Sequence, residues 1–203
     1  MWREVLELSR PKNVILATIA VPIGAHLALS GDWNSQSAGL VALQTTSAVC
    51  FMAAGNTMND VADVDIDRKN KFHKPIPSGR ISVESATKVA YLFGIISLGL
   101  MAVGSYLSEE PIAIVMIWLA ASMLMLTYDS GPKTKNYGLM GNISISLMVG
   151  AVILFGAASV SLVNTPIVIY AAAVAFFANL AREIVKDCED MESDVGRNTL
   201  PMR

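Results

Sequence analysis

Hydrophobic residues occur in long uncharged stretches along this chain, and the charged residues are confined to short segments between them. The uncharged stretches are residues 13–31, 33–59, 89–108, 111–128 and 136–181. A membrane-spanning helix needs roughly 20 mainly apolar residues, so each of the first four stretches holds one span and the last holds two, divided near residues 164–166. The pattern therefore predicts an all-α, polytopic transmembrane bundle of six helices, with residues 1–203 forming a single domain.

The basic residues support this count independently. All 15 Lys and Arg residues lie before the first span, between the second and third, between the fourth and fifth, or at and beyond the end of the sixth. The other connecting segments contain Asp32, Glu109 and Glu110 but no basic residue. Because Lys and Arg collect in cytoplasmic loops, we expect a multi-pass protein of the cell membrane with both ends of this chain on the cytoplasmic side.

The composition agrees with a protein that sits in a lipid bilayer. Hydrophobic residues make up 53% of the chain and charged residues 16%. The net charge of -2 does not separate one class of membrane protein from another. A basic stripe with interleaved aromatic residues is missing from the sequence, so nucleic acid is not an expected partner. The oligomeric state is not predicted.

Two acidic triplets with one spacing follow predicted spans two and six. They are Asp60, Asp63 and Asp67, and then Asp187, Asp190 and Asp194. On a helix, steps of three and four residues keep side chains within a narrow arc. Each triplet should therefore point its three carboxylates one way, and both triplets lie on the predicted cytoplasmic side.

Carboxylates gathered in this way repel one another, by roughly 3 kcal/mol per pair at about 6 Å and an effective dielectric constant near 20. A divalent metal, Mg²⁺ above all, would offset that repulsion and keep coordination positions for phosphate oxygens. Alternatively, each triplet is a solvated loop at a helix end, since charge runs usually are solvated faces. Lys and Arg in the same segments can bind phosphate, so the metal interpretation predicts a diphosphate site at the cytoplasmic mouth of a central cavity.

Four segments resemble the motifs of the UbiA-type intramembrane prenyltransferases. They are NDVADVDID (59–67), KPIPSGRIS (74–82), REIVKDCEDMESDVGRNTLP (182–201) and LELSRPKN (6–13), together with Tyr128, Lys133, Gly141 and Asn142 in the second basic loop. The resemblance covers essentially the whole chain. Members of this family normally have nine spans, so the resemblance implies that this chain lacks the C-terminal three helices.

The resemblance implies an enzyme that transfers a prenyl group from an isoprenyl diphosphate to a lipid acceptor, with Mg²⁺ as cofactor. The PKN and REIVKD stretches are most similar to archaeal members that transfer geranylgeranyl from its diphosphate to the free hydroxyl of geranylgeranylglyceryl phosphate, in ether-lipid biosynthesis. One alternative is polyprenyl transfer to an aromatic acceptor such as 4-hydroxybenzoate, in quinone biosynthesis. From another class, the acids would belong to a divalent-cation transporter or a structural membrane protein.

The resemblance also assigns residues to roles. The expected metal ligands are Asn59, Asp60, Asp63, Asp67, Asp187, Asp190 and Asp194, and the expected catalytic residues among them are Asp63, Asp67, Asp190 and Asp194. The expected substrate-binding residues are Arg10, Asn13, Arg68, Lys74, Arg80, Tyr128, Lys133, Arg182, Lys186 and Arg197. The alternative for each cation is that it only sets the orientation of the spans in the membrane. Arg68 and Lys133 are the favoured phosphate ligands.

The segment between the first triplet and the third span has its own expected role. Two prolines and a glycine in residues 68–82 rule out a continuous helix. We expect this segment to act as a lid that keeps water from the reacting carbon. Lys74 stands where the family commonly has Arg, which keeps the positive charge but loses the two-pronged geometry of a guanidinium.

Overall fold

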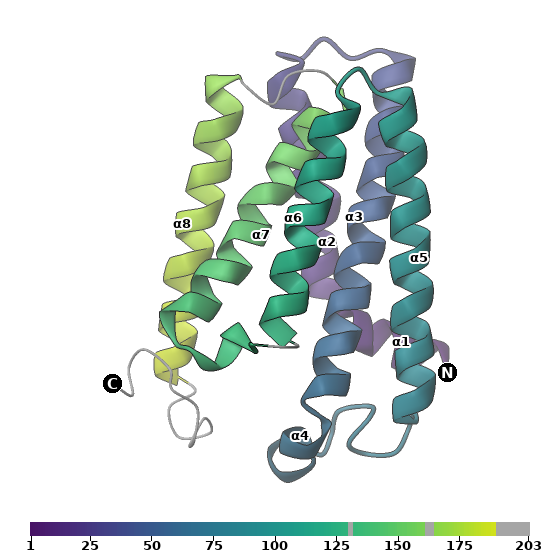
Figure 1. Cartoon of the computed structure of the whole chain (residues 1–203), viewed down its shortest axis with the longest axis vertical. Helices are drawn as coiled ribbons and strands as arrows, with labels where there is room; N and C mark the ends of the chain where they lie inside the picture. Colours follow the sequence, from purple (N-terminus) through teal and green to yellow (C-terminus); the bar gives the residue numbers. More distant parts are fainter. Residues whose placement is uncertain (130–131, 161–164, 190–203) are drawn as a thin grey trace.

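Six long helices lie side by side in the computed structural model (Figure 1), which describes residues 1–129, 132–160 and 165–189. All regular structure in these residues is helical. The long helices are α2 (Pro11–Ala28), α3 (Ser35–Ala62), α5 (Val83–Leu107), α6 (Pro111–Asp129), α7 (Leu139–Ala158) and α8 (Pro166–Glu189). Each is long and apolar enough to cross a membrane, so the predicted six spans are confirmed. Short helices α1 (Trp2–Ser9), α4 (Val64–Asn70) and η1 (Thr134–Asn136) lie between or before them.

Several helix boundaries follow from local sequence chemistry. Proline begins α2, α6 and α8, where its missing N–H leaves no hydrogen bond unmade. Asn34 and Ser37 form a capping box at the start of α3, in which Asn34 Oδ1 accepts from the Ser37 N–H (2.8 Å) and Ser37 Oγ accepts from the Asn34 N–H (3.0 Å). The Ser82 hydroxyl caps α5 by accepting from the Ser85 N–H at 3.1 Å.

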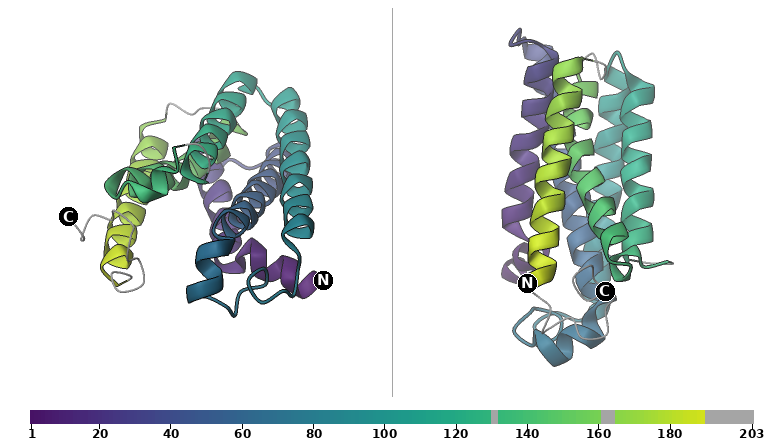
Figure 2. Two further views of the ribbon diagram at one scale, coloured as in Figure 1. Left: turned by 60° about the horizontal axis from the view of Figure 1, so that its bottom comes forward. Right: turned by 90° about the vertical axis from the view of Figure 1, so that its left-hand side faces the viewer.

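Five of the long helices follow one another around a bundle. Helix α3 packs between α2 and α5, α6 packs between α5 and α7, and α7 returns to α2. Helix α8 lies outside this group against α7 and α2, and the left view in Figure 2 shows it at the edge of the bundle. Large apolar side chains on the outer faces of α2, α5 and α6 are exposed, which suits contact with lipid.

The main apolar core lies toward the end of the bundle where α2 leads into α3. It is formed by Val21, Ala25, Val41, Met101, Ile114, Phe155 and Ala158. Glycines bring α2 and α7 close together beside it, because a Cβ at Gly24 or Gly156 would overlap a backbone carbonyl of the other helix. Small residues permit this approach in a membrane, where packing replaces the hydrophobic effect between helices.

Neutral polar side chains hold α5 to α3 and to α6 within the spans. Ser47 Oγ donates to the Ser97 carbonyl oxygen at 2.8 Å, and Trp118 Nε1 donates to Ser97 Oγ at 3.1 Å. Gln44 is fully buried, and its Nε2 donates to the Met101 carbonyl oxygen at 3.4 Å. These contacts act between helices, as hydrogen bonds in a membrane interior commonly do.

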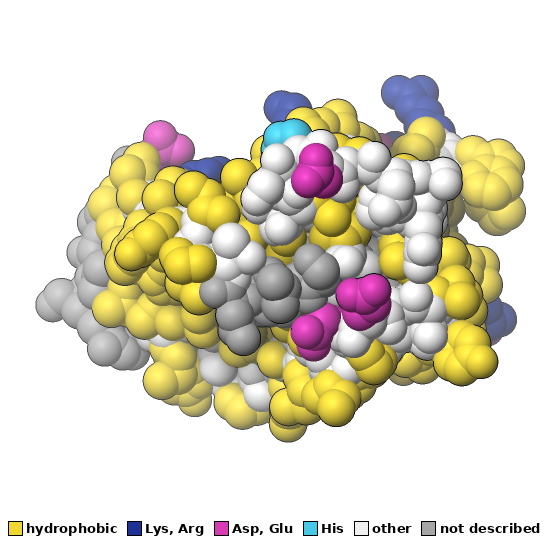
Figure 3. All heavy atoms as spheres, turned by 90° about the horizontal axis from the view of Figure 1, so that it is seen from above, with side chains coloured by type: hydrophobic (Ala, Val, Ile, Leu, Met, Phe, Trp, Pro, Cys, Tyr) yellow, Lys and Arg dark blue, Asp and Glu magenta, His cyan; other side chains and the backbone are white. Residues whose placement is uncertain are grey.

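The two ends of the bundle differ in charge. The loops at the end viewed in Figure 3 contain Asp32, Glu109 and Glu110 but neither Lys nor Arg. Helices α1 and α4, the segment 71–82 and the C-terminal end of α8 lie at the opposite end (Figure 1). This opposite end therefore holds the first acidic triplet and the described residue of the second, Asp187.

Candidate active site

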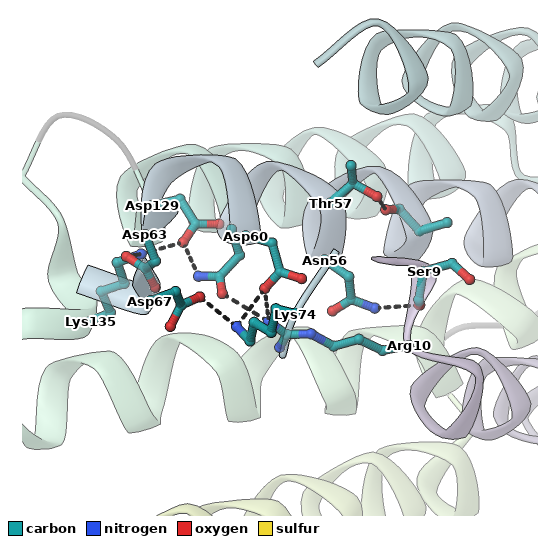
Figure 4. A network of polar contacts seen from close by, with 12 residues as sticks. Ser9, Arg10, Asn56, Thr57, Asp60, Asp63, Asp67, Lys74, Asp129 and Lys135 are labelled. Atoms are coloured by element: carbon teal, nitrogen blue, oxygen red, sulfur yellow. Dashed lines mark hydrogen bonds and ion pairs between the residues drawn. The ribbon is translucent and has the colours of Figure 1, made fainter. Parts of the chain in front are cut away.

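The backbone changes direction within the first acidic triplet and stays close to helical. Helix α3 ends at Ala62 and α4 begins at Val64, with Asp63 between them at φ -98° and ψ 7°. The Asp63 N–H donates to the Asn59 carbonyl oxygen (3.0 Å), and the Asp67 N–H donates to the Asp63 carbonyl oxygen (2.8 Å). Near-helical spacing therefore persists across the break, and the three carboxylates lie close to one another (Figure 4).

Lys74 joins two of these carboxylates. Its Nζ donates to Asp60 Oδ1 at 2.9 Å and to Asp67 Oδ2 at 2.6 Å. Both aspartate side chains are only 6% exposed. Two buried carboxylates two helical turns apart therefore share one ammonium group, which offsets their mutual repulsion.

Lys135 joins the third carboxylate to an acid from another helix. Its Nζ, on η1, donates to Asp63 Oδ1 at 2.7 Å and to Asp129 Oδ1 at 3.0 Å. Asn59 Nδ2 also donates to Asp129 Oδ1, at 2.5 Å. Asp129 is the last residue of α6, so this group of contacts ties α3, α6 and η1 together.

Arg10 approaches the same group from the junction of α1 and α2. Its backbone is left-handed, at φ 54°, and its Nη2 donates to Asp60 Oδ1 at 2.7 Å and to Asn59 Oδ1 at 3.1 Å. Figure 4 shows the side chains of Arg10, Asp60 and Lys74 pointing toward one another at the end of α3. We call the following eight residues the polar network: Arg10, Asn59, Asp60, Asp63, Asp67, Lys74, Asp129 and Lys135.

The polar network contains four carboxylates and three cations, all in part-buried or buried contacts. Its donors toward a metal would be carboxylate and amide oxygens, the ligands that Mg²⁺ prefers. Each lysine ammonium already lies between two carboxylates, so a positive charge is stabilised at two places. In their present positions, no three acidic, histidine or cysteine residues of the described chain could hold one metal ion. The ligand chemistry fits Mg²⁺, and in this structure Lys74 and Lys135 occupy these carboxylates.

The second triplet reaches the site through Asp187. Asn142 Nδ2, in the first turn of α7, donates to Asp187 Oδ2 at 2.8 Å. A Cβ on Gly141 would lie 2.9 Å from the Lys135 Cα, so η1 packs tightly on the start of α7. Residues 134–142 thus contact Asp63 through Lys135 and Asp187 through Asn142. Asp190, Asp194 and Arg197 lie outside the described residues.

Other expected substrate-binding cations have contacts of their own. Arg68 makes an exposed pair with Asp65 at 3.4 Å, and Lys133 is exposed. Arg182 forms a short ion pair with Glu183, and Lys186 lies 3.8 Å from the same acid. Arg68 and Lys133, the favoured phosphate ligands, are thus outside the polar network, and their substrate role stays a prediction. Asn13 and Tyr128 are partly buried. In the sequence, Asn13 follows Arg10 by three residues and Tyr128 directly precedes Asp129.

Two residues of the polar network, Asp129 and Lys135, were not singled out from the sequence. Glu183, a buried acid on α8 that is only 6% exposed, was not singled out either, and it pairs with Arg182 outside the network. Asp129 carried one usable signal, since it is the charge that ends an 18-residue uncharged stretch, 111–128. Lys135 lies two residues from the expected Lys133, and only the path of η1 decides which lysine turns inward.

The segment 71–82 is anchored at both its apolar and its polar side chains. Ile76 and Ile81 pack with Leu8 of α1 and Ala86 of α5, and Pro75 is fully buried. Arg80 holds Glu7 of α1 with both Nη atoms, at 2.7 and 2.9 Å. As predicted, the segment beyond α4 is not a continuous helix, and it lies against α1 next to the polar network.

This anchor should weaken in acid. The Arg80 hydrogen bond lowers the pKa of Glu7 below its ordinary value of 4.5, so the stabilisation is present above that value and is lost as pH falls through the lowered pKa. We expect hydrogen exchange of the 71–82 amides to accelerate as pH falls below about 4.5, relative to the intrinsic rate. Glu7→Gln should remove the pH dependence and Glu4→Gln should retain it. An identical profile in Glu7→Gln would show that this pair does not anchor the segment.

The fold and the site together define a class: an integral membrane protein whose helices gather carboxylates and cations at one polar end. The family model described as the UbiA prenyltransferase family matches residues 15–203. The chain belongs to this family. The predicted family, the all-helical membrane fold and the prenyltransferase class of enzyme are confirmed.

Curated relatives and solved structures agree with this assignment. A digeranylgeranylglyceryl phosphate synthase of Methanopyrus kandleri is 38% identical over 98% of this chain and 69% of its own length. The enzyme of that name from Methanococcus aeolicus is 32% identical, over 97% of this chain and 66% of its own. The chain thus spans about two thirds of the length of these relatives.

Among solved structures, one concerning digeranylgeranylglyceryl phosphate synthase in membranes matches with a TM-score of 0.74 and 30% identity, over 99% of this chain and 68% of that one. A UbiA homologue from Archaeoglobus fulgidus, bound to GPP and Mg²⁺, matches with a TM-score of 0.70 and 25% identity, over 94% and 65%. Prenyl diphosphate and Mg²⁺ are therefore found together on a protein of this fold.

Proposed function

We propose that the protein transfers geranylgeranyl from geranylgeranyl diphosphate to the free hydroxyl of geranylgeranylglyceryl phosphate, with release of diphosphate. The observation that carries the proposal is the segment 134–142, which contacts both acidic motifs, through Lys135 to Asp63 and through Asn142 to Asp187. A diphosphate bound there would meet carboxylates for its metal and ammonium groups for its oxygens. The curated relatives bearing the synthase name support this choice of acceptor.

The chain's own residues would bind and orient the donor. Lys74, Lys135 and Arg10 are placed to exchange carboxylate partners for phosphate oxygens. Mg²⁺, when bound, would neutralise the departing diphosphate. Its ligands would come from Asn59, Asp60, Asp63, Asp67, Asp187, Asp190 and Asp194. The segment 71–82 would cover the reacting carbon and keep water from it, because it is packed against α1 beside the network.

The remaining features of the proposal concern placement. The polar network would face the cytoplasm, since the loops at its end of the bundle carry the Lys and Arg residues. Residues 1–203 would act within one prenyltransferase domain. Contacts between segments far apart in the sequence support this, such as Arg10 with Asp60 and Asn142 with Asp187. The apolar chains of donor and acceptor would lie among the helices, with their phosphate groups at this polar end.

Acceptor competition tests the proposed function directly. The full chain in membranes would be given geranylgeranyl diphosphate with equal amounts of geranylgeranylglyceryl phosphate and 4-hydroxybenzoate, with Mg²⁺ or with a chelator. We expect prenylated glyceryl phosphate and released diphosphate only with Mg²⁺. Prenylation of 4-hydroxybenzoate instead would assign the quinone reaction. Turnover of neither acceptor by folded protein would overturn the proposal.

A further inference from the structure

Asp129 is a buried acid at the end of a membrane span. Its side chain is 6% exposed, and the residue closes α6, where the uncharged stretch meets the polar end of the bundle. A buried carboxylate is costly unless hydrogen-bonded and paired with positive charge. Both requirements are met, by Asn59 on α3, which lies 70 residues away in the sequence, and by Lys135 on η1, which lies six residues away.

The contact with Asn59 fixes the direction of an amide. An ionised carboxylate only accepts hydrogen bonds, and a guanidinium only donates them. Asp129 Oδ1 accepts from Asn59 Nδ2, and Arg10 Nη2 donates to Asn59 Oδ1 at 3.1 Å. The amide is therefore held with its nitrogen toward Asp129 and its oxygen toward Arg10, whose Nη2 also donates to Asp60 Oδ1. An amide turned the other way would face donor with donor and acceptor with acceptor.

The contact with Lys135 fixes a cation. Lys135 Nζ lies 3.0 Å from Asp129 Oδ1 and 2.7 Å from Asp63 Oδ1, and its side chain is 8% exposed. Asp129 thus keeps the ammonium group beside the first acidic motif. Of the two carboxylates that contact Lys135 here, a neutral residue at position 129 would leave only that of Asp63.

We propose that Asp129 is a positioning residue for the reaction: it aims the Asn59 amide oxygen toward the metal-binding acids and holds Lys135 where diphosphate would bind. This inference rests on the proposed function. Asp129 contacts Asn59 and Lys135 and would act on the reaction through these two residues. Groups that orient metal ligands in this way typically change metal affinity or activity by about 10- to 100-fold when replaced.

The test compares Asp129→Asn with Asp65→Asn in the full chain. The two changes are chemically identical, and Asp65 is an α4 residue whose side chain is 89% exposed. Binding of Mg²⁺ with inorganic diphosphate is followed by the rise in melting temperature during a Mg²⁺ titration. We expect the half-saturating Mg²⁺ concentration to increase about 10- to 100-fold in Asp129→Asn. It should be unchanged in Asp65→Asn and partly restored in Asp129→Glu.

A second readout needs no ligand. Labelling of Lys135 by an amine-reactive reagent, mapped by mass spectrometry, should accelerate in Asp129→Asn and stay at the parental rate in Asp65→Asn. Unchanged labelling together with unchanged Mg²⁺ dependence would overturn the inference. A lower melting temperature alone, with parental labelling and titration, would show a purely structural role and also overturn it. A third result is possible, in which Asp129→Asn is labelled faster but the parent protein shows no response to Mg²⁺ and diphosphate. That result would support the positioning of Lys135 by Asp129 and would refute the proposed function.

Discussion

Replacing Asp63 by asparagine is expected to lower Mg²⁺-dependent turnover of the prenyl diphosphate by roughly 10²- to 10³-fold, the effect of removing one group that stabilises developing charge. Asp63 lies at the α3–α4 break, and its Oδ1 accepts from Lys135 Nζ at 2.7 Å. The amide keeps the size of the side chain but supplies no charge to a divalent cation. Diphosphate release from geranylgeranyl diphosphate, measured over a range of Mg²⁺ concentrations, follows the effect.

Asp65→Asn serves as the matched control for this substitution, because Asp65 lies two residues away with its side chain exposed to solvent. It should keep parental turnover. Both variants should insert into the membrane and elute as the parent does, since neither residue is in a span. Parental Mg²⁺-dependent turnover in Asp63→Asn would exclude a metal role for this carboxylate.

Replacing Gly156 by alanine is expected to destabilise the bundle by about 3 kcal/mol, toward the upper end of the cost of overpacking a core. The added Cβ would overlap the carbonyl oxygen of Val21 on α2. A backbone atom cannot rotate aside as a side chain can, so α2 and α7 must separate. Their separation would open the main core, in which Phe155 of α7 and Val21 of α2 both pack.

Thermal or denaturant unfolding in detergent measures this cost. Gly99→Ala on α5 is the control, because a Cβ there meets no atom within 4 Å. It should be neutral or slightly stabilising, as alanine favours a helix over glycine by up to about 1 kcal/mol. Gly24→Ala should resemble Gly156→Ala, and the double variant should cost less than the sum, since one separation relieves both overlaps. Equal stability of the Gly156 and Gly99 variants would contradict the close packing of α2 on α7.

The sequence was informative about the spans for a simple reason. A helix that crosses a bilayer needs about 20 apolar residues in a row, so each span can be recognised from its own stretch of sequence. Helix ends were also readable, as the prolines that begin α2, α6 and α8 show. The first acidic triplet was found by its spacing, and Asp60 and Asp67 do meet, at Lys74.

The partners of those acids were much harder to predict. Asn59 and Asp129 are 70 residues apart, and Lys135 and Asp63 are 72 apart. Their pairing depends on α6 returning beside α3 and on η1 turning its second residue inward. Lys133, the expected ligand, is exposed for the same reason, because the backbone path between α6 and α7 directs it outward.

The sequence by itself determined the membrane class, the six spans, the family and the acidic residues that mark one end of the bundle. Each of these rests on a local pattern, either an apolar run or a short spacing. The tertiary structure alone decided which cations neutralise which acids, and that Asp129 belongs with them. Ion pairing depends on distances of a few ångströms between side chains on different helices, and no pattern along the chain encodes such distances.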